Sequence, residues 1–296
     1  MKQPSAMRLA LSGMLALAVA IGIGRFAFTP LLPMMQKDYG VTLRLAGLLA
    51  AANYVGYFIG ALSAIWMRAR PATMVGSSLL ATVVLTAAMG GRHDASVWLL
   101  LRGLAGVASA WILVFGSAWI LQQLALAGKK SLGGVVFGGV GLGTAFTGAL
   151  CVIFLYLDWH ADRAWWVLGA VALLLAGACW PGFRVAVPAG TTAASVTAQS
   201  LQLRDHAAVV TCYAILGFGY IIPATFLSAM ARQAIADPVL FGWAWPAFGS
   251  AALVSTLLAG WLSAHLSNRR IWALAHAVMA VGVATPVLLP GMAGIA

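Results

Sequence analysis

The sequence opens with a long apolar stretch, LALSGMLALAVAIGIGRFAFTPLLPMM (residues 9–35), in which Arg25 is the one charged residue. A transmembrane helix needs about 20 mainly apolar residues, so this stretch is long enough to cross a bilayer. The chain of 296 residues is 62% hydrophobic and 8% charged, a composition that excludes an ordinary soluble protein. Eight more stretches of the same kind follow the first: Leu45–Met67, Ala72–Gly90, Val97–Leu126, Leu132–Leu157, Trp165–Phe183, Ala207–Met230, Leu240–His265 and Ile271–Pro290. We therefore predict an all-α integral membrane protein with nine spans.

The distribution of basic residues predicts the orientation. Cytoplasmic loops of membrane proteins carry an excess of Lys and Arg. If the N-terminus is cytoplasmic, the inner loops hold Lys2, Arg8, Arg68, Arg70, Lys129, Lys130, Arg184, Arg204, Arg269 and Arg270, and the outer loops hold Lys37, Arg44, Arg92, Arg163 and Arg232. We therefore expect a multi-pass protein of the inner membrane with its N-terminus in the cytoplasm.

The net charge of +11 has a simple explanation in a membrane protein. Basic residues at the cytoplasmic face are attracted to anionic lipid headgroups, and no basic run here exceeds two residues. This pattern argues against a nucleic-acid partner. The N-terminus resembles a secretory signal, but the apolar run continues through Pro30 and more spans follow, so we interpret it as an uncleaved first helix.

One long polar segment divides the chain. It covers residues 184–206, which we interpret as a cytoplasmic linker between a six-helix bundle (1–183) and a second unit with three helices (207–296). The two units share a pattern: at an offset of 195, Gly22 and Gly24 match Gly217 and Gly219, and at an offset of 200, GALSA at 60–64 matches GWLSA at 260–264. Such matches in the same orientation are typical of parallel repeats in transporters.

These features resemble the major facilitator superfamily, whose members consist of two six-helix bundles joined by a cytoplasmic loop. The segment GWLSAHLSNRR (260–270) resembles the superfamily signature G-x-L-x-D-R-x-G-R-R, and GALSAIWMRAR (60–70) is a weaker copy. Both have alanine, Ala264 and Ala64, where the signature has aspartate.

A narrower resemblance covers the whole chain. The segments GRFAFTPLLP (24–33), ANYVGYFIG (52–60), LRGLAGVASA (101–110) and GGVVFGGVGLG (133–143) are similar to the YbfB/YjiJ-type branch of the superfamily. The resemblance implies a transporter but no particular substrate. It also implies twelve spans, so we expect this chain to be a form truncated after about nine, with an incomplete second bundle.

Two arginines within the spans are the main candidates for a binding site. Arg25 lies sixteen residues after Leu9 and Arg102 lies five residues after Val97, which places both in the half of the membrane away from the N-terminus. The resemblance implies that their helices line the central cavity. Because arginine binds carboxylates and phosphates bidentately, two such residues without an acidic partner favour an anionic organic substrate. The alternatives are that the side chains reach the interface or are satisfied by backbone carbonyls.

Four other polar residues complete the predicted site. Asn53 and Tyr57 share one helical face with Gly56 and Gly60, and either substrate binding or helix packing explains them. Ser109 follows Arg102 on the face of the fourth span, and Tyr220 aligns with Arg25 in the repeat, so that it would face Arg25 across the cavity.

The remaining motifs predict packing and not chemistry. The glycines of the fifth span follow no strand and precede no Lys-Ser/Thr pair, so they do not form a phosphate-binding loop. Two interleaved pairs, Gly134/Gly138 and Gly139/Gly143, instead predict close helix contacts. We expect a structural role for His276 in the ninth span.

We therefore predict a secondary transporter of a small organic solute, with an anion favoured, that works as a monomer by alternating access. We expect no cofactor and no metal, since Cys151, Cys179 and Cys212 lie in three different spans. The alternatives are a non-functional fragment or scaffold, and an integral-membrane transferase, which is disfavoured because no catalytic set shares one depth. The substrate, the coupling ion and the direction of transport do not follow from the sequence.

The orientation is tested by reporter fusions. We expect alkaline phosphatase to be inactive when fused at Ser195 and active when fused at Ala296, because the charge distribution places these positions on opposite sides of the membrane. Phosphatase activity at Ser195 would refute the orientation.

Overall fold

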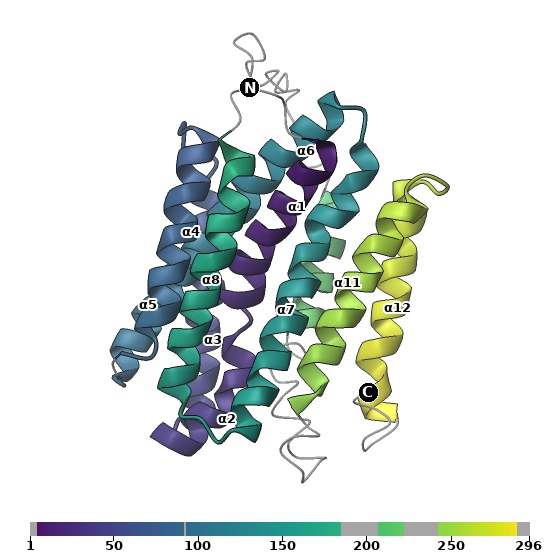
Figure 1. Cartoon of the computed structure of the whole chain (residues 1–296). Helices are drawn as coiled ribbons and strands as arrows, with labels where there is room; N and C mark the ends of the chain where they lie inside the picture. Colours follow the sequence, from purple (N-terminus) through teal and green to yellow (C-terminus); the bar gives the residue numbers. More distant parts are fainter. Residues whose placement is uncertain (1–4, 92, 185–206, 222–241, 289–296) are drawn as a thin grey trace.

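The structure, a computed structural model, describes residues 5–91, 93–184, 207–221 and 242–288, and every regular element in these ranges is helical (Figure 1). The elements are α1 (Ala6–Leu17), the π-helical η1 (Ala18–Ile23), α2 (Phe28–Tyr39), α3 (Leu43–Ser63), α4 (Pro71–Ala88), α5 (Ala95–Trp111), the π-helical η2 (Ile112–Gly116), α6 (Ser117–Leu126), η3 (Lys130–Leu132), α7 (Gly133–Tyr156), α8 (Ala161–Phe183), α11 (Ala244–Leu262) and α12 (Asn268–Leu288). A further apolar helix covers Ala207–Ile221.

Seven helices in the described ranges are long and apolar enough to cross a membrane. They correspond to the first six predicted spans and the eighth. The predicted seventh and ninth spans are helical over Ala207–Ile221 and Asn268–Leu288 but are not among these seven. The rest of the seventh span and all of the predicted linker except Arg184 lie outside the described residues, so the domain boundary stays a prediction.

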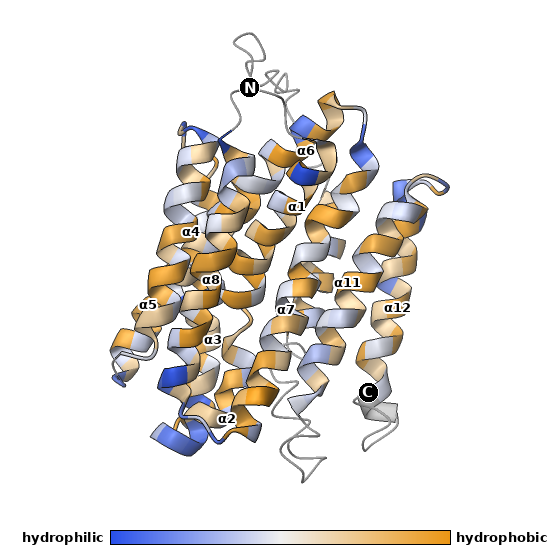
Figure 2. Cartoon of the chain, in the orientation of Figure 1, coloured by the Kyte–Doolittle hydropathy of each residue, from blue (hydrophilic) through white to orange (hydrophobic). Residues whose placement is uncertain are grey.

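The outer surface of the helices confirms that the surrounding solvent is apolar. Large hydrophobic side chains point outward along the helices, among them Phe58, Leu80 and Leu174, which are 64%, 60% and 74% exposed. Figure 2 shows hydrophobic residues along the helices and hydrophilic residues gathered near their ends. Because such a surface is costly in water and favourable in hydrocarbon, the structure fits an all-α integral membrane protein.

Local chemistry sets where the helices begin and end. Gly40, in the left-handed region at φ 64°, ends α2, and the side chain of Thr42 accepts a hydrogen bond from the Leu45 amide at the start of α3. The helix α4 begins with Pro71, which suits the first position because no intrahelical donor is needed there. The first residue of α8, Ala161, donates its amide to the Asp38 carboxylate at 2.7 Å, so a residue distant in the sequence fixes this boundary.

At the end of the first bundle opposite α1, contacts between loops connect the ends of several helices. The Lys37 ammonium donates a hydrogen bond to the Asp158 carboxylate, and this bond with its charge lowers the pKa of Asp158. Nearby, the Tyr39 ring stacks on His93 at 4.0 Å and the Trp98 indole donates to the Met89 carbonyl. These contacts join the ends of the first, third, fourth, fifth and sixth spans.

The glycines of α7 form two faces that contact two different helices. On one face, a Cβ atom at Gly139 or Gly143 would lie 2.0 or 2.6 Å from backbone carbonyls of the first span. On the other face, Gly134, Gly141 and Gly148 meet α11 along its length, with the added Cβ atoms 3.0, 2.2 and 2.7 Å from its atoms. The prediction of close helix packing is confirmed, and α7 links the first span to α11 (Figure 1).

We expect Gly141→Ala to destabilise the protein by about 1–3 kcal/mol, the usual cost of overpacking. The new methyl group would lie 2.2 Å from the Leu253 backbone nitrogen, and backbone atoms cannot yield without separating α7 from α11. The control is Gly177→Ala in α8, where a Cβ atom has open space. Thermal unfolding in detergent measures both, and equal melting temperatures would contradict the proposed contact.

Candidate functional site

Arg102 on α5 is buried and hydrogen-bonded to the backbone of the first span. Its side chain is 3% exposed, and its two terminal nitrogens donate to the carbonyls of Gly24 and Arg25 at 3.1 and 2.8 Å. Its guanidinium lies 5.0 Å from the centre of the Phe28 ring. Arg102 therefore lies at the level of Arg25 and does not extend to the membrane–water interface. Its hydrogen bonds to backbone carbonyls correspond to one of the alternatives given in the sequence analysis.

Those two carbonyls are available because the first span is interrupted. The amides of Gly24 and Phe26 donate five residues back, to Val19 and Ile21, as in a π-helix. Pro30 has no amide hydrogen to donate to the Phe26 carbonyl, and the Thr29 amide donates to that carbonyl instead of to Arg25. The break thus exposes acceptors inside an apolar helix, and Arg102 satisfies them.

Asn53 and Ser109 also make backbone contacts. The Asn53 amide nitrogen donates to the Arg102 carbonyl at 2.9 Å, and its side chain is fully buried between α3 and α5. These helices pack backbone against backbone, since a Cβ atom at Gly56 would lie 1.9 Å from the Gly103 carbonyl oxygen. The Ser109 hydroxyl donates to carbonyls of its own helix, at 2.6 and 3.0 Å. Both residues lie where helix packing explains them.

Arg25 has a different environment from Arg102. Its side chain is half-buried, and its guanidinium carbon lies 4.5, 5.0 and 5.4 Å from the ring centres of Tyr57, Tyr54 and Phe26. Within the described ranges its Nε has no hydrogen-bond partner, as is also true of the Arg102 Nε, and the ion pairs found there involve other residues. Cation–π contacts stabilise the charge while leaving hydrogen-bond donors at the edge of the guanidinium.

A row of aromatic rings extends from Arg25 to the helix Ala207–Ile221. Phe26 meets Trp245 of α11 edge to face at 5.8 Å, Trp245 stacks on Phe248 at 5.1 Å, and Phe248 stacks on Tyr220 at 6.2 Å. We call these four residues the aromatic row. Tyr220 therefore lies at the end of the row away from Arg25, and the prediction that it faces Arg25 across the cavity stays a prediction.

Comparison with known proteins agrees with this arrangement. Residues 17–296 match the model of a family described as "Uncharacterised MFS-type transporter YbfB". The chain belongs to this family. The transporter is also similar to a solved structure titled "Crystal structure of D-xylose-proton symporter", with a TM-score of 0.65, 12% sequence identity, and coverage of 98% of this chain and 76% of the symporter chain. At this identity the likeness shows the fold alone, and it confirms the predicted major facilitator fold. No curated protein matches the sequence.

The predicted site residues fall into two groups in the transporter. Arg25 and Tyr57 lie together where the first span meets α3, and Tyr220 is linked to them through the aromatic row. Arg102, Asn53 and Ser109 lie behind them and bond to backbone. Sequence reasoning missed Tyr54, Phe26, Trp245 and Phe248. The spacing of Tyr54 and Tyr57 was a usable signal for Tyr54, since residues three apart share a helical face.

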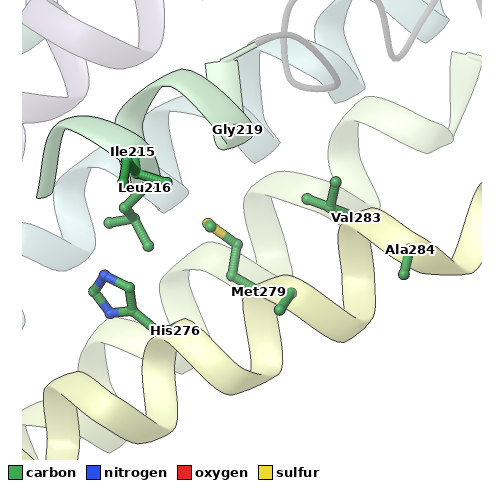
Figure 3. A pocket seen from close by; sticks show the side chains of 8 residues that line it. Ile215, Leu216, Gly219, His276, Met279, Val283 and Ala284 are labelled. Atoms are coloured by element: carbon green, nitrogen blue, oxygen red, sulfur yellow. The ribbon is translucent and has the colours of Figure 1, made fainter. Parts of the chain in front are cut away.

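A cavity elsewhere in the transporter has different chemistry. It has a volume of about 620 Å³ and lies between the helix Ala207–Ile221 and α12 (Figure 3). Its lining is apolar except for His276, whose Nδ1 lies 2.8 Å from the Trp272 carbonyl oxygen and whose Nε2 has no partner in the described ranges. No predicted substrate-binding residue lines this cavity. In the same ranges, no group of three His, Cys, Asp or Glu side chains could hold a metal ion.

We expect Arg102→Lys to destabilise the transporter and Arg25→Lys to have little effect on stability. Lysine cannot donate to the Gly24 and Arg25 carbonyls at the same time with the geometry of the two guanidinium nitrogens. Losing one charged hydrogen bond lowers the free energy of unfolding by about 1.5–3 kcal/mol. Thermal unfolding in detergent compares the two variants. An equal loss of stability would mean that Arg102 does not hold the break in the first span.

Proposed function

We propose that the chain is a secondary transporter that moves a small organic anion across the inner membrane by alternating access, with Arg25 as the anion-binding group. The observation that carries this proposal is the half-buried Arg25 guanidinium, which in the described ranges lies against aromatic rings and contacts no carboxylate. A charged side chain at the centre of a bilayer costs about 2.5–3.5 kcal/mol on insertion scales, and a bound anion offsets this cost.

The position of Arg25 supports a role in transport. Arg25 follows η1 in the first span, and the rings against it are those of Tyr54 and Tyr57 from α3 and of Phe26. Phe26 in turn connects to α11 and to the helix Ala207–Ile221 through the aromatic row. The site therefore joins residues from both sides of the predicted linker. A ligand held there contacts two units whose relative movement is the basis of alternating access.

The orientation and the oligomeric state belong to the same proposal. The excess of basic residues in the loops at the N-terminal side supports a cytoplasmic N-terminus. We propose that the transporter works as a monomer.

The test is an anion-binding assay on the full chain in lipid nanodiscs. A thermal-shift screen of carboxylates, sulfonates and phosphates against matched neutral amides identifies ligands, and counterflow in proteoliposomes then measures transport. We expect anionic hits, and we expect Arg25→Lys to weaken their binding about 10–150-fold because lysine lacks the planar fork.

The matched control is Arg163→Lys, which changes an arginine that also lies against an aromatic ring, Trp159, but outside the cluster. We expect no change in affinity for this variant. If a folded Arg25→Ala variant keeps its affinity for every anionic hit, Arg25 is not the anion-binding group. Binding without counterflow would support a scaffold and not a transporter.

A further inference from the structure

We infer that the anion held by Arg25 is an aromatic monocarboxylate, with its carboxylate on the guanidinium and its ring against the aromatic row. This inference rests on the proposed function and narrows its substrate class. Two features of the site carry it: the number of positive charges that are free to bind a ligand, and the type of surface beside them.

The site offers one free guanidinium and not two. Both terminal nitrogens of Arg102 donate to backbone carbonyls, and its side chain is 3% exposed. Arg25 keeps accessible surface and contacts rings instead of carbonyls, whereas the Nε atoms of both arginines lack a partner in the described part of the chain. A second carboxylate on the ligand would be desolvated without a cation beside it, which is costly in an apolar setting. The charge balance therefore favours a ligand with a single negative charge.

The surface beside Arg25 consists of aromatic rings. Phe26 and Trp245 are 5% and 0% exposed and form the buried part of the aromatic row. The other two rings of the row, Phe248 and Tyr220, are half-buried and partly accessible, as is Tyr57 against Arg25. Aromatic pairs prefer stacked or edge-to-face contacts and bind more strongly than their area alone predicts. A planar aromatic body therefore fits this surface better than a saturated body of the same size.

A further hydrogen-bond donor lies in the same row. The Trp245 side chain is fully buried, and its Nε1 has no hydrogen-bond partner in the described part of the chain. Buried tryptophan N–H groups usually find an acceptor. In the described part of the chain, the row therefore carries an unsatisfied donor beside Phe26.

The apolar cavity between the helix Ala207–Ile221 and α12 is a poorer place for such a ligand. Its lining contains no arginine or lysine, and its polar group is the imidazole of His276 (Figure 3). A carboxylate there would lack a permanent positive partner. The observations therefore place the ligand at Arg25.

The test compares four ligands that differ in one property each. Phenylacetate carries a ring and one charge, cyclohexylacetate replaces the ring by a saturated one, phenylacetamide removes the charge, and phenylmalonate adds a second charge. Dissociation constants are measured with the full chain in lipid nanodiscs. We expect phenylacetate to bind about 2–10-fold more tightly than cyclohexylacetate, and more tightly than the other two.

Variants of the half-buried rings test whether the preference for an aromatic ligand comes from the rings beside Arg25. We expect Tyr220→Leu and Tyr57→Leu to bring the ratio of the phenylacetate and cyclohexylacetate constants close to one, and Tyr220→Phe to keep it. Tyr156→Leu is the control, because Tyr156 is 76% exposed at the end of α7. A ratio of two ligands on one variant is insensitive to the fraction of folded protein.

The outcomes separate this inference from the proposed function. If both acids bind equally and Arg25→Lys weakens both, the aromatic preference is wrong and the anion site stands. If phenylmalonate binds more tightly than phenylacetate, the single-charge argument is wrong. If neither these acids nor any anion of the wider screen binds, the proposed function and this inference both fail.

Discussion

The hydrogen bonds from Arg102 to the first span are the interaction on which the rest of the site depends. The π-helical register and Pro30 leave the carbonyls of Gly24 and Arg25 without helical donors, and hydrocarbon supplies none. A guanidinium that is itself buried satisfies both carbonyls. These bonds use both terminal nitrogens of Arg102 and fix the backbone of Arg25. Arg102 therefore positions Arg25, and the guanidinium of Arg25 stays available to bind a ligand.

The position of α7 relates this site to movement of the transporter. One glycine face of α7 contacts the first span near Arg25, and the other contacts α11, which carries Trp245 and Phe248. Close glycine contacts leave few interlocking side chains, so they permit one helix to shift along another. A shift of α11 against α7 changes the distance between Trp245 and Phe26, and with it the surface beside Arg25.

Much of the fold could be predicted from the sequence, because the hydropathy of a segment shows directly whether it lies in the bilayer or in water. The predicted stretches 45–67 and 97–126 correspond to helices Leu43–Ser63 and Ala95–Leu126. The start of the sixth span was missed by four residues, Trp165 against Ala161, because the capping carboxylate is Asp38, 123 residues away. Hydropathy cannot detect a partner so distant in the sequence. The shared level of Arg25 and Arg102 was predictable, since helical rise converts residue number into depth.

The different roles of the two arginines were not predictable, for a physical reason. Polar groups in a bilayer satisfy one another, so a polar residue in a span is first explained by the nearest unpaired backbone group. Ser109 bonds to its own helix and Asn53 to the helix beside it, and both acceptors depend on helix rotation and register. Arg102 reaches two carbonyls that exist because the backbone of the first span departs from the α-helical register. Once these acceptors are assigned, Arg25 is the charged side chain of the two whose contacts are with rings and not with acceptors. Arg102 is buried with both terminal nitrogens bonded to carbonyls, whereas Arg25 keeps accessible surface and has no carboxylate partner among the described residues. An anionic ligand can supply that partner, and this distinguishes Arg25 from Arg102.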